Sequence, residues 1–266
     1  MASRTKQKEE ARARRLAEER AAAERAQRTR RMRMLGGVAG LAIVIAAVVI
    51  AISSSSSTKP PTASGPQAKL TAANLGPVSA LGRLASSGNP GATGPEGVPV
   101  PNASPLAPAG SPSPGQSVDG ISCQSGEQTL FHVHTHLTIF VNGTPKQIPA
   151  GVGISSPQAQ QTASGPDVAN GACFSWLHTH AGDGIIHIES PVQRTFTLGN
   201  FFDVWGQPLG PNQVGPIKGQ VTAFYNGRHY IGDPQNIPLA DRVQIQLNVG
   251  RPVTAPETIS WQGTGL

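Results

Sequence analysis

Residues 131–143 read FHVHTHLTIFVNG, and the alternation in this stretch decides how the chain folds. Successive side chains on a β-strand point to opposite faces, so His132, His134 and His136 share one face while mostly apolar residues occupy the other. Asn142-Gly143 is typical of a two-residue hairpin turn. The stretch therefore predicts a strand that carries a row of histidines on one face and leads into a hairpin.

A second histidine-rich stretch, residues 173–189, reads CFSWLHTHAGDGIIHIE. If Gly182-Asp183 forms a two-residue turn, His178 lies opposite His187 on the neighbouring strand, with Cβ atoms about 5 Å apart. His180 then lies one step along the same face. The two stretches contain six of the seven histidines in the chain, so they predict a local cluster of imidazoles.

This clustering indicates a transition-metal site, because imidazole nitrogen is a common ligand of zinc, copper, iron and nickel. A polar sheet face, or hydrogen-bonded core histidines, is the alternative. His132 and His136 would lie about 13 Å apart along the strand, so only adjacent histidines of this row can bind the same ion. The simplest arrangement joins His134 and one neighbour to two histidines of the second stretch; six ligands could also hold two ions. The candidate ligands are His132, His134, His136, His178, His180 and His187.

The expected metal is a divalent ion, copper(II) or zinc. All three methionines precede residue 35 and no free thiolate is evident in the predicted domain, so a soft copper(I) site is less natural. Glu189 borders the predicted site and is expected to orient an imidazole or to act as a base toward metal-bound water. Asp183 is expected mainly to serve the turn.

Cys123 and Cys173 are the only cysteines, and each precedes one of the histidine stretches. In an oxidising compartment a disulfide between them is the default, and loop entropy gives it about 3–4 kcal/mol of stabilisation. Ligation of the metal by the two thiolates is the alternative.

The charge of the chain lies at its N-terminal end. Residues 1–34 carry 12 Lys/Arg and 5 Glu, whereas the rest carries 9 Lys/Arg and 10 Asp/Glu. The near-neutral remainder argues against nucleic acid as a partner. We expect the basic segment to be helical and cytoplasmic, and to orient a membrane anchor; recognition of anionic lipid is the alternative.

Residues 35–52 form an uncharged apolar run, long enough for a transmembrane helix. The positive-inside rule places the preceding segment in the cytoplasm and the rest of the chain outside it, in a single-pass topology. A cleaved signal peptide is the alternative. Membrane lipid is the one partner that this expectation implies, and the sequence does not identify a protein partner.

Composition divides the remaining chain into three parts. Residues 53–118 are rich in Pro, Gly, Ser and Ala, and predict a disordered linker, apart from an apolar patch at 75–84 that is expected to dock as a short helix or strand. Residues 119–250 are expected to form one extracytoplasmic domain, and 251–266 a C-terminal tail.

Within the domain the predicted class is α+β and strand-rich. After the first hairpin, residues 155–170 read as a polar loop, and 198–205 (LGNFFDVW) as a short helix capped by Thr197. A second hairpin turns at Asn226-Gly227, and 243–249 (VQIQLNV) alternates as the last strand. The order from residue 185 onward resembles a β-grasp domain. An all-β sandwich is the alternative.

The two histidine motifs, followed by RTFTLGNFFDVWGQPL, resemble a family of exported or membrane-anchored bacterial proteins of uncharacterised function, over residues 75–249. The resemblance supports the unity of the two motifs and implies no activity. The sequence thus favours an anchored domain that binds a transition metal for storage, tolerance or delivery. A metal-dependent hydrolase or oxygenase with the same histidines, and a non-catalytic cell-envelope interaction domain, are the alternatives.

Overall fold

The computed structural model describes residues 70–266. The expected basic segment, the transmembrane helix at 35–52 and the first part of the linker lie outside the described residues. Among residues 70–266, no helix is long and apolar enough to cross a bilayer. These residues are strand-rich and contain one α-helix, α2 (Leu198–Trp205).

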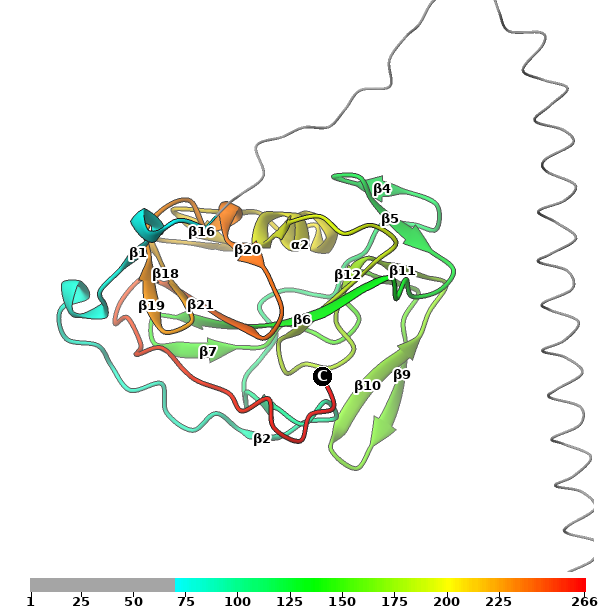
Figure 1. The fold of residues 1–266 in the computed structure, drawn as a ribbon. Coiled ribbons are helices and arrows are strands. Elements are labelled where there is room, and N and C mark those ends of the chain that lie inside the picture. Colours follow the sequence, from blue (N-terminus) through cyan, green and yellow to red (C-terminus); the bar gives the residue numbers. More distant parts are fainter. Residues whose placement is uncertain (1–69) are drawn as a thin grey trace, which may run out of the picture. The chain divides into compact units, whose positions relative to one another are not determined.

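A mixed sheet forms the centre of the fold (Figure 1). Its two middle strands, β6 (Phe131–Val141) and β21 (Val243–Val249), run parallel to each other, and the other pairings are antiparallel. The remaining strands are β13 (Ile185–Ser190) and β12 (Leu177–His178) beside β6, then β18 (Val221–Tyr225), β19 (Arg228–Tyr230) and β1 (Leu75–Gly76) beside β21, with β7 (Thr144–Lys146) pairing the end of β6.

The connections between these strands confirm the strand-rich α+β prediction. The chain runs β6, β13, α2, β18, β19, β21, whereas the strands lie in the sheet in the order β13, β6, β21, β18, β19. The first strand of this series, β6, and the last, β21, are therefore parallel neighbours at the centre of the sheet. The hairpin β18–β19 lies beside β21, and α2 lies in the connection from β13 to β18. This strand order is that of a β-grasp domain, but its first two strands are β6 and β13 and not, as the sequence predicted, two strands that follow residue 184.

The hairpin turns follow from the Asn-Gly pairs. Asn142 and Gly143 have φ of 50° and 78°, and Asn226 and Gly227 have 47° and 75°. Left-handed conformations at both central positions make the type I′ turn, which matches the twist of the flanking strands. Val141 consequently pairs with Thr144, as predicted.

The turn between His178 and His187 differs from the prediction. Strand β12 ends at His178 and β13 begins at Ile185, so residues 179–184 connect them instead of a two-residue turn. Gly184, with φ of 88°, takes the left-handed conformation. The register is nevertheless the predicted one, because His178 pairs with His187.

Helix α2 begins and ends where the sequence predicts. The Thr197 hydroxyl accepts from the Asn200 amide, and the Asn200 side chain accepts from the Thr197 amide, which satisfies two free N–H groups. Gly206 ends the helix in the left-handed conformation. The buried face of the helix carries Phe201, Phe202 and Trp205, which pack on the apolar face of the sheet in the main core.

The opposite face of the sheet is polar and is covered by two extended segments (Figure 1). One contains β2 (Ala92–Thr93) and β3 (Pro99–Val100), and the other is residues 250–266. Gln246 donates to the carbonyl oxygen of Thr254, and Asn248 accepts from the Thr254 amide at 2.9 Å. Both of these sheet residues are buried.

Residues 70–118 and 251–266 are thus part of the folded unit, which corrects their assignment as linker and tail. Val98 is fully buried and Leu106 belongs to the main core. The expected docking of 75–84 is confirmed, because β1 pairs with β19. The prediction from composition failed because these segments need no core of their own. They dock on a sheet that the rest of the chain forms.

Smaller elements complete the described residues. The predicted polar loop at 155–170 contains a hairpin, β9 (Gln158–Thr162) with β10 (Gly165–Asn170). The others are β4 (Ser117–Val118), β5 (Ile121–Gln124), β11 (Cys173–Ser175) and β8 (Ile154–Ser155) in one sheet, β14 (Phe196–Thr197) with β20 (Pro238–Leu239), β15 (Leu209–Gly210), β16 (Gln213–Val214) and β17 (Ile217–Lys218), and the 3-10 turns η1 (Ala72–Asn74), η2 (Val78–Leu81) and η3 (Pro234–Asn236).

Candidate metal centre

Three neighbouring strands bring one histidine each into a row across the polar face of the sheet. His134 on β6 pairs with His187 on β13, which pairs with His178 on β12. Adjacent strands lie about 4.8 Å apart, so register alone makes these imidazoles neighbours. The rings of His178 and His187 stack with centroids 5.3 Å apart, and those of His134 and His187 meet edge to face at 4.6 Å.

The pair His178 and His180 has a fixed tautomer. The Nδ1–H of His178 donates to the carbonyl oxygen of Ser175 at 2.8 Å, and that of His180 donates to Val168 at 2.7 Å. In a neutral imidazole this leaves a lone pair on each Nε2. The two Nε2 atoms lie 3.1 Å apart. Burial, together with neighbouring His187 and His180, holds the pKa of His178 well below its ordinary value, so this ring is neutral.

Two neutral rings with these tautomers cannot hydrogen-bond to each other through Nε2. A backbone carbonyl that accepts from the far nitrogen is the usual way in which a protein orients a metal-binding imidazole. The pair therefore has the donor geometry of a metal ligand pair.

His132 and His134 form a second pair, with their Nε2 atoms 3.1 Å apart. Burial and the charge of His187 lower the pKa of His134 to about 4, which keeps this ring neutral. Glu189, which pairs with His132 across the strands, places Oε1 3.1 Å from His132 Nε2. The second pair therefore has a carboxylate beside it.

His187 lies between two carboxylates. Its Nε2 is 2.5 Å from Glu96 Oε1, and its Nδ1 is 3.3 Å from Glu189 Oε1. Burial opposes protonation, but the hydrogen bonds and charges of the two carboxylates outweigh it and raise the pKa of His187 to about 9. Without a metal, a proton on His187 supplies the positive charge that the two buried carboxylates require.

Glu96 was not predicted as a site residue. It lies in the Gly94-Pro95-Glu96-Gly97 turn between β2 and β3, where the Gly97 amide donates to the carbonyl oxygen of Gly94 at 3.1 Å. The Pro-containing tetrapeptide predicts a turn. No spacing in the sequence relates that turn to the histidines, so the signal was insufficient.

Asp183 does more than form a turn. Its Oδ1 accepts from the Ile185 amide at 3.2 Å, which is ordinary turn chemistry. Burial, reinforced by the negative charge of Glu96, also raises the pKa of Asp183 to about 8. The protonated Asp183 carboxyl can donate to Glu96, which in turn contacts His187.

His136 lies apart from the candidate ligands, which corrects its prediction as one. Its Nε2–H donates to the carbonyl oxygen of Asp183 at 2.8 Å, and its Nδ1 lies 3.0 Å from the side-chain oxygen Oε1 of Gln244. Burial lowers the pKa of His136 to about 4. Both ring nitrogens are therefore engaged, and His136 anchors the loop 179–184 to the sheet.

The other predicted histidines fall into two ligand sets. One set is His132, His134, His187 and Glu189, and the other is His178, His180, His187 and Glu189. Within each set the ligand atoms lie within 4.8 Å of one another. Ligands around a tetrahedral zinc ion are separated by about 3.4 Å, so small side-chain rotations would close either set on an ion. The donors, imidazole nitrogen and carboxylate oxygen, suit zinc or copper(II).

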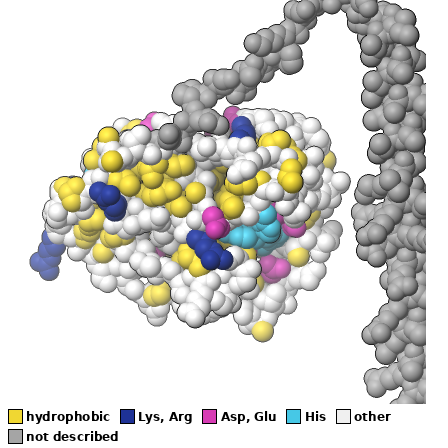
Figure 2. Space-filling view, viewed as in Figure 1, with side chains coloured by type: hydrophobic (Ala, Val, Ile, Leu, Met, Phe, Trp, Pro, Cys, Tyr) yellow, Lys and Arg dark blue, Asp and Glu magenta, His cyan; other side chains and the backbone are white. Residues whose placement is uncertain are grey.

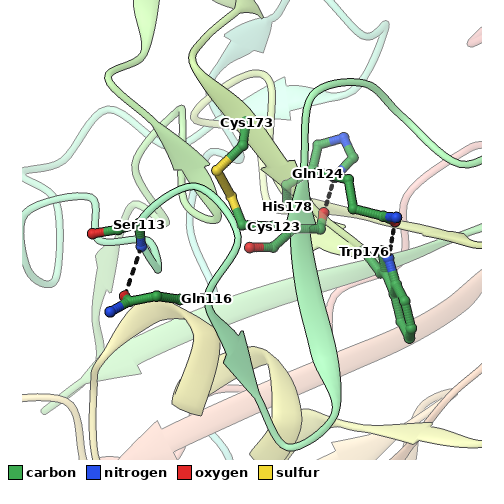
Figure 3. Close-up of a disulfide and its surroundings, with 8 residues drawn as sticks. Ser113, Gln116, Cys123, Gln124, Cys173, Trp176 and His178 are labelled. Carbon is green, nitrogen blue, oxygen red and sulfur yellow. Dashed lines mark hydrogen bonds between the residues drawn. A yellow bond between two sulfur atoms is a disulfide. The ribbon is translucent and has the colours of Figure 1, made fainter.

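A disulfide joins Cys123 to Cys173 (Figure 3), as predicted. It links β5 to β11, where Ser175 pairs with Cys123. Trp176 strengthens the junction by donating from Nε1 to Gln124 at 2.7 Å. Both sulfurs are in the disulfide, so the thiolate-ligand alternative does not apply. The covalent link instead fixes the strand that leads directly into His178.

The cluster opens to solvent on one side. Figure 2 shows histidine side chains at the surface in one patch bordered by acidic side chains. The side chain of His132 is 41% exposed, whereas His178 is fully buried. Glu127, half exposed, places Oε1 3.5 Å from His180 Nε2. An ion can therefore reach the cluster past His132 without unfolding of the sheet.

Comparison with known proteins found no matching family model, no matching curated protein and no matching solved structure.

Proposed function

We propose that residues 70–266 bind a transition-metal ion through the clustered histidines. The observation that carries the proposal is the pair His178 and His180, whose Nδ1 atoms are held by backbone carbonyls while their Nε2 atoms converge at 3.1 Å. A histidine needed only for packing gains nothing from such an arrangement. A cation between the two lone pairs removes their repulsion.

Copper(II) and zinc are the metals that this donor set fits best. Both accept three or four imidazole and carboxylate ligands at about 2.0–2.2 Å. The described residues contain no methionine and no free cysteine, so soft donors that select copper(I) are missing from this part of the chain.

The biological role that we propose is metal storage, tolerance or delivery outside the cytoplasm. The disulfide supports an oxidising compartment. The apolar run at 35–52 supports a single-pass anchor with the N-terminus in the cytoplasm. In this proposal the membrane holds the domain where metal enters or leaves the cell.

A metal-dependent enzyme is the second candidate, favoured by the open side at His132 and by the proximity of Glu189 as a base. The cavity geometry favours binding instead. A cavity of about 830 Å³ is lined by Phe131, Val133 and Leu239. Phe131 and Val133 point to the face of β6 opposite the histidines, so this cavity offers no substrate space beside the ligands.

Thermal unfolding of the full chain with and without metal tests the proposal. A ligand at 100 times its dissociation constant stabilises a folded protein by about 2.7 kcal/mol, so zinc or copper(II) should raise the melting temperature. The double variant His178→Ala/His180→Ala should lose that increment, and His229→Ala, outside both ligand sets, should keep it. No shift with copper, zinc, nickel, manganese or iron(II) would leave only the packing explanation.

A further inference from the structure

We propose that the cluster is a two-ion centre in which Glu189 bridges the ions. The inference rests on the proposed metal binding and adds the number of ions and the identity of the shared ligands. Its basis is that the two ligand sets have His187 and Glu189 in common, and that each contributes a separate histidine pair.

The two histidine pairs do not converge on a single point. The Nε2 atoms within each pair are 3.1 Å apart. The pairs, however, belong to different sets of mutually close ligand atoms. Bonds of about 2.0–2.1 Å to one ion would require all four imidazoles to converge. The backbone carbonyls that hold His178 and His180 oppose such a movement. Two ions, one at each pair, need only small rotations.

Glu189 belongs to both ligand sets and has two carboxylate oxygens with which to bind. Its Oε1 faces the first set, at 3.1 Å from His132 and 3.3 Å from His187. Its Oε2 is buried and has no hydrogen-bond partner, although a buried carboxylate oxygen ordinarily has one. A carboxylate that binds one ion through each oxygen is a common bridge in two-metal sites, where the ions lie about 3.5–4 Å apart. The second ion would satisfy Oε2.

The carboxylates around the cluster offset much of the charge of two divalent ions. Glu96 contacts His187 at 2.5 Å, and Glu127 approaches His180 at 3.5 Å. With Glu189, three carboxylates surround five imidazoles. The Oε2 of Glu96 is also buried without a hydrogen-bond partner. With three carboxylates, one divalent ion leaves a net charge of −1 and two ions leave +1, so the cluster can accept a second ion at a net charge of the same size.

The two positions differ in their access to solvent, which should give the two ions different exchange rates. The first set opens to solvent at His132, whereas the second contains fully buried His178. We expect the ion at the second set to exchange slowly and the ion at the first set to exchange rapidly.

Native mass spectrometry of the full chain, titrated with zinc and separately with copper(II), tests the inference. Two ions of either metal per chain are expected for the wild type. The variants His132→Ala/His134→Ala and His178→Ala/His180→Ala should each retain one, and His229→Ala should retain two. A wild type that binds one ion, with both double variants binding none, would overturn the two-ion centre and leave the proposed function intact. No ion in the wild type would overturn both.

Electron paramagnetic resonance of the copper(II)-loaded wild type keeps the test independent of variants that fail to fold. Two copper(II) ions joined by a carboxylate couple, so the integrated signal should fall well below that expected for the copper bound. A full-intensity signal from two bound ions would show that they are isolated, and would overturn the Glu189 bridge.

Discussion

Glu96 Oε1 lies 2.5 Å from His187 Nε2, although 91 positions separate the two residues in the chain. The contact joins the extended segment around β2 and β3 to the central sheet at the point where the candidate ligands converge. A segment with linker composition thus supplies a carboxylate to the site, so metal affinity should depend on it.

Glu96→Gln tests that dependence. The substitution keeps the size of the side chain but removes the charge beside His187, so we expect metal affinity to fall about 10- to 100-fold, the usual cost of losing a residue that supports a metal ligand. Isothermal titration with zinc measures it. Glu257→Gln is the matched control, since the Glu257 amide donates to Gln246 on the same face of the sheet, whereas no ion pair between Glu257 and a histidine is found among the described residues. Equal affinities of the two variants would contradict the assigned role of Glu96.

His136→Ala separates the histidine that supports the fold from those that bind metal. The substitution leaves the carbonyl oxygen of Asp183 and Oε1 of Gln244 without their buried partner, which should lower the free energy of unfolding by on the order of 1–3 kcal/mol. Urea unfolding measures the loss. The number of bound ions should not change. A stable variant that loses metal would mean that His136 is a ligand after all.

Removal of the disulfide should lower the free energy of unfolding of the domain while the metal-binding side chains stay in place. For Cys123→Ser/Cys173→Ser we expect the free energy of unfolding of the metal-free protein to fall by about 3–4 kcal/mol, because the bridge closes a separation of 50 positions in the unfolded chain. Denaturant titration of wild type with and without a reducing agent is the control. If stability were unchanged, β5 and β11 would not need the covalent link.

Asp203, which lies on α2 and in neither ligand set, should make stability depend on pH. Partial burial of its carboxyl, with the hydrogen bond and charge of Asp119, raises its pKa from 3.8 to about 6. A raised carboxyl pKa favours the fold below about pH 4, and this contribution disappears as pH rises through about 6. The charge also lies near the C-terminal end of α2, where anions are unfavourable.

Asp203→Asn should therefore raise the melting temperature at pH 8 and have little effect at pH 4. Calorimetry with a chelator present measures this, and Asp241→Asn, at an exposed position, serves as the control. A melting temperature that falls at pH 8 would contradict the unfavourable contact between Asp203 and Asp119.

Local features of the fold could be predicted because their causes lie within a few residues. The Asn-Gly turns, the Thr197 cap and the alternation of 243–249 each depend on neighbours in the chain. The pairing of His178 with His187 also followed from the hairpin, even though its turn has six residues instead of two. A register survives a change of loop when buried alternation fixes it.

Long-range features could not be predicted for the same reason. His136 lies on the same face of its strand as His134. Its contacts with Gln244, 108 positions away, and with the Asp183 carbonyl are what hold it apart from the candidate ligands. Glu96 joins them only when its segment docks on the polar face. Alternation shows which face a side chain points to, but not what covers that face.

Elemental analysis of the full chain, purified from its native compartment without added metal, tests the central claim most directly. The account predicts copper or zinc in stoichiometric amount, up to two ions per chain, and loss of that metal from His178→Ala/His180→Ala but not from His229→Ala. A wild-type protein without transition metal, which also fails to take up zinc or copper(II) in vitro, would contradict it.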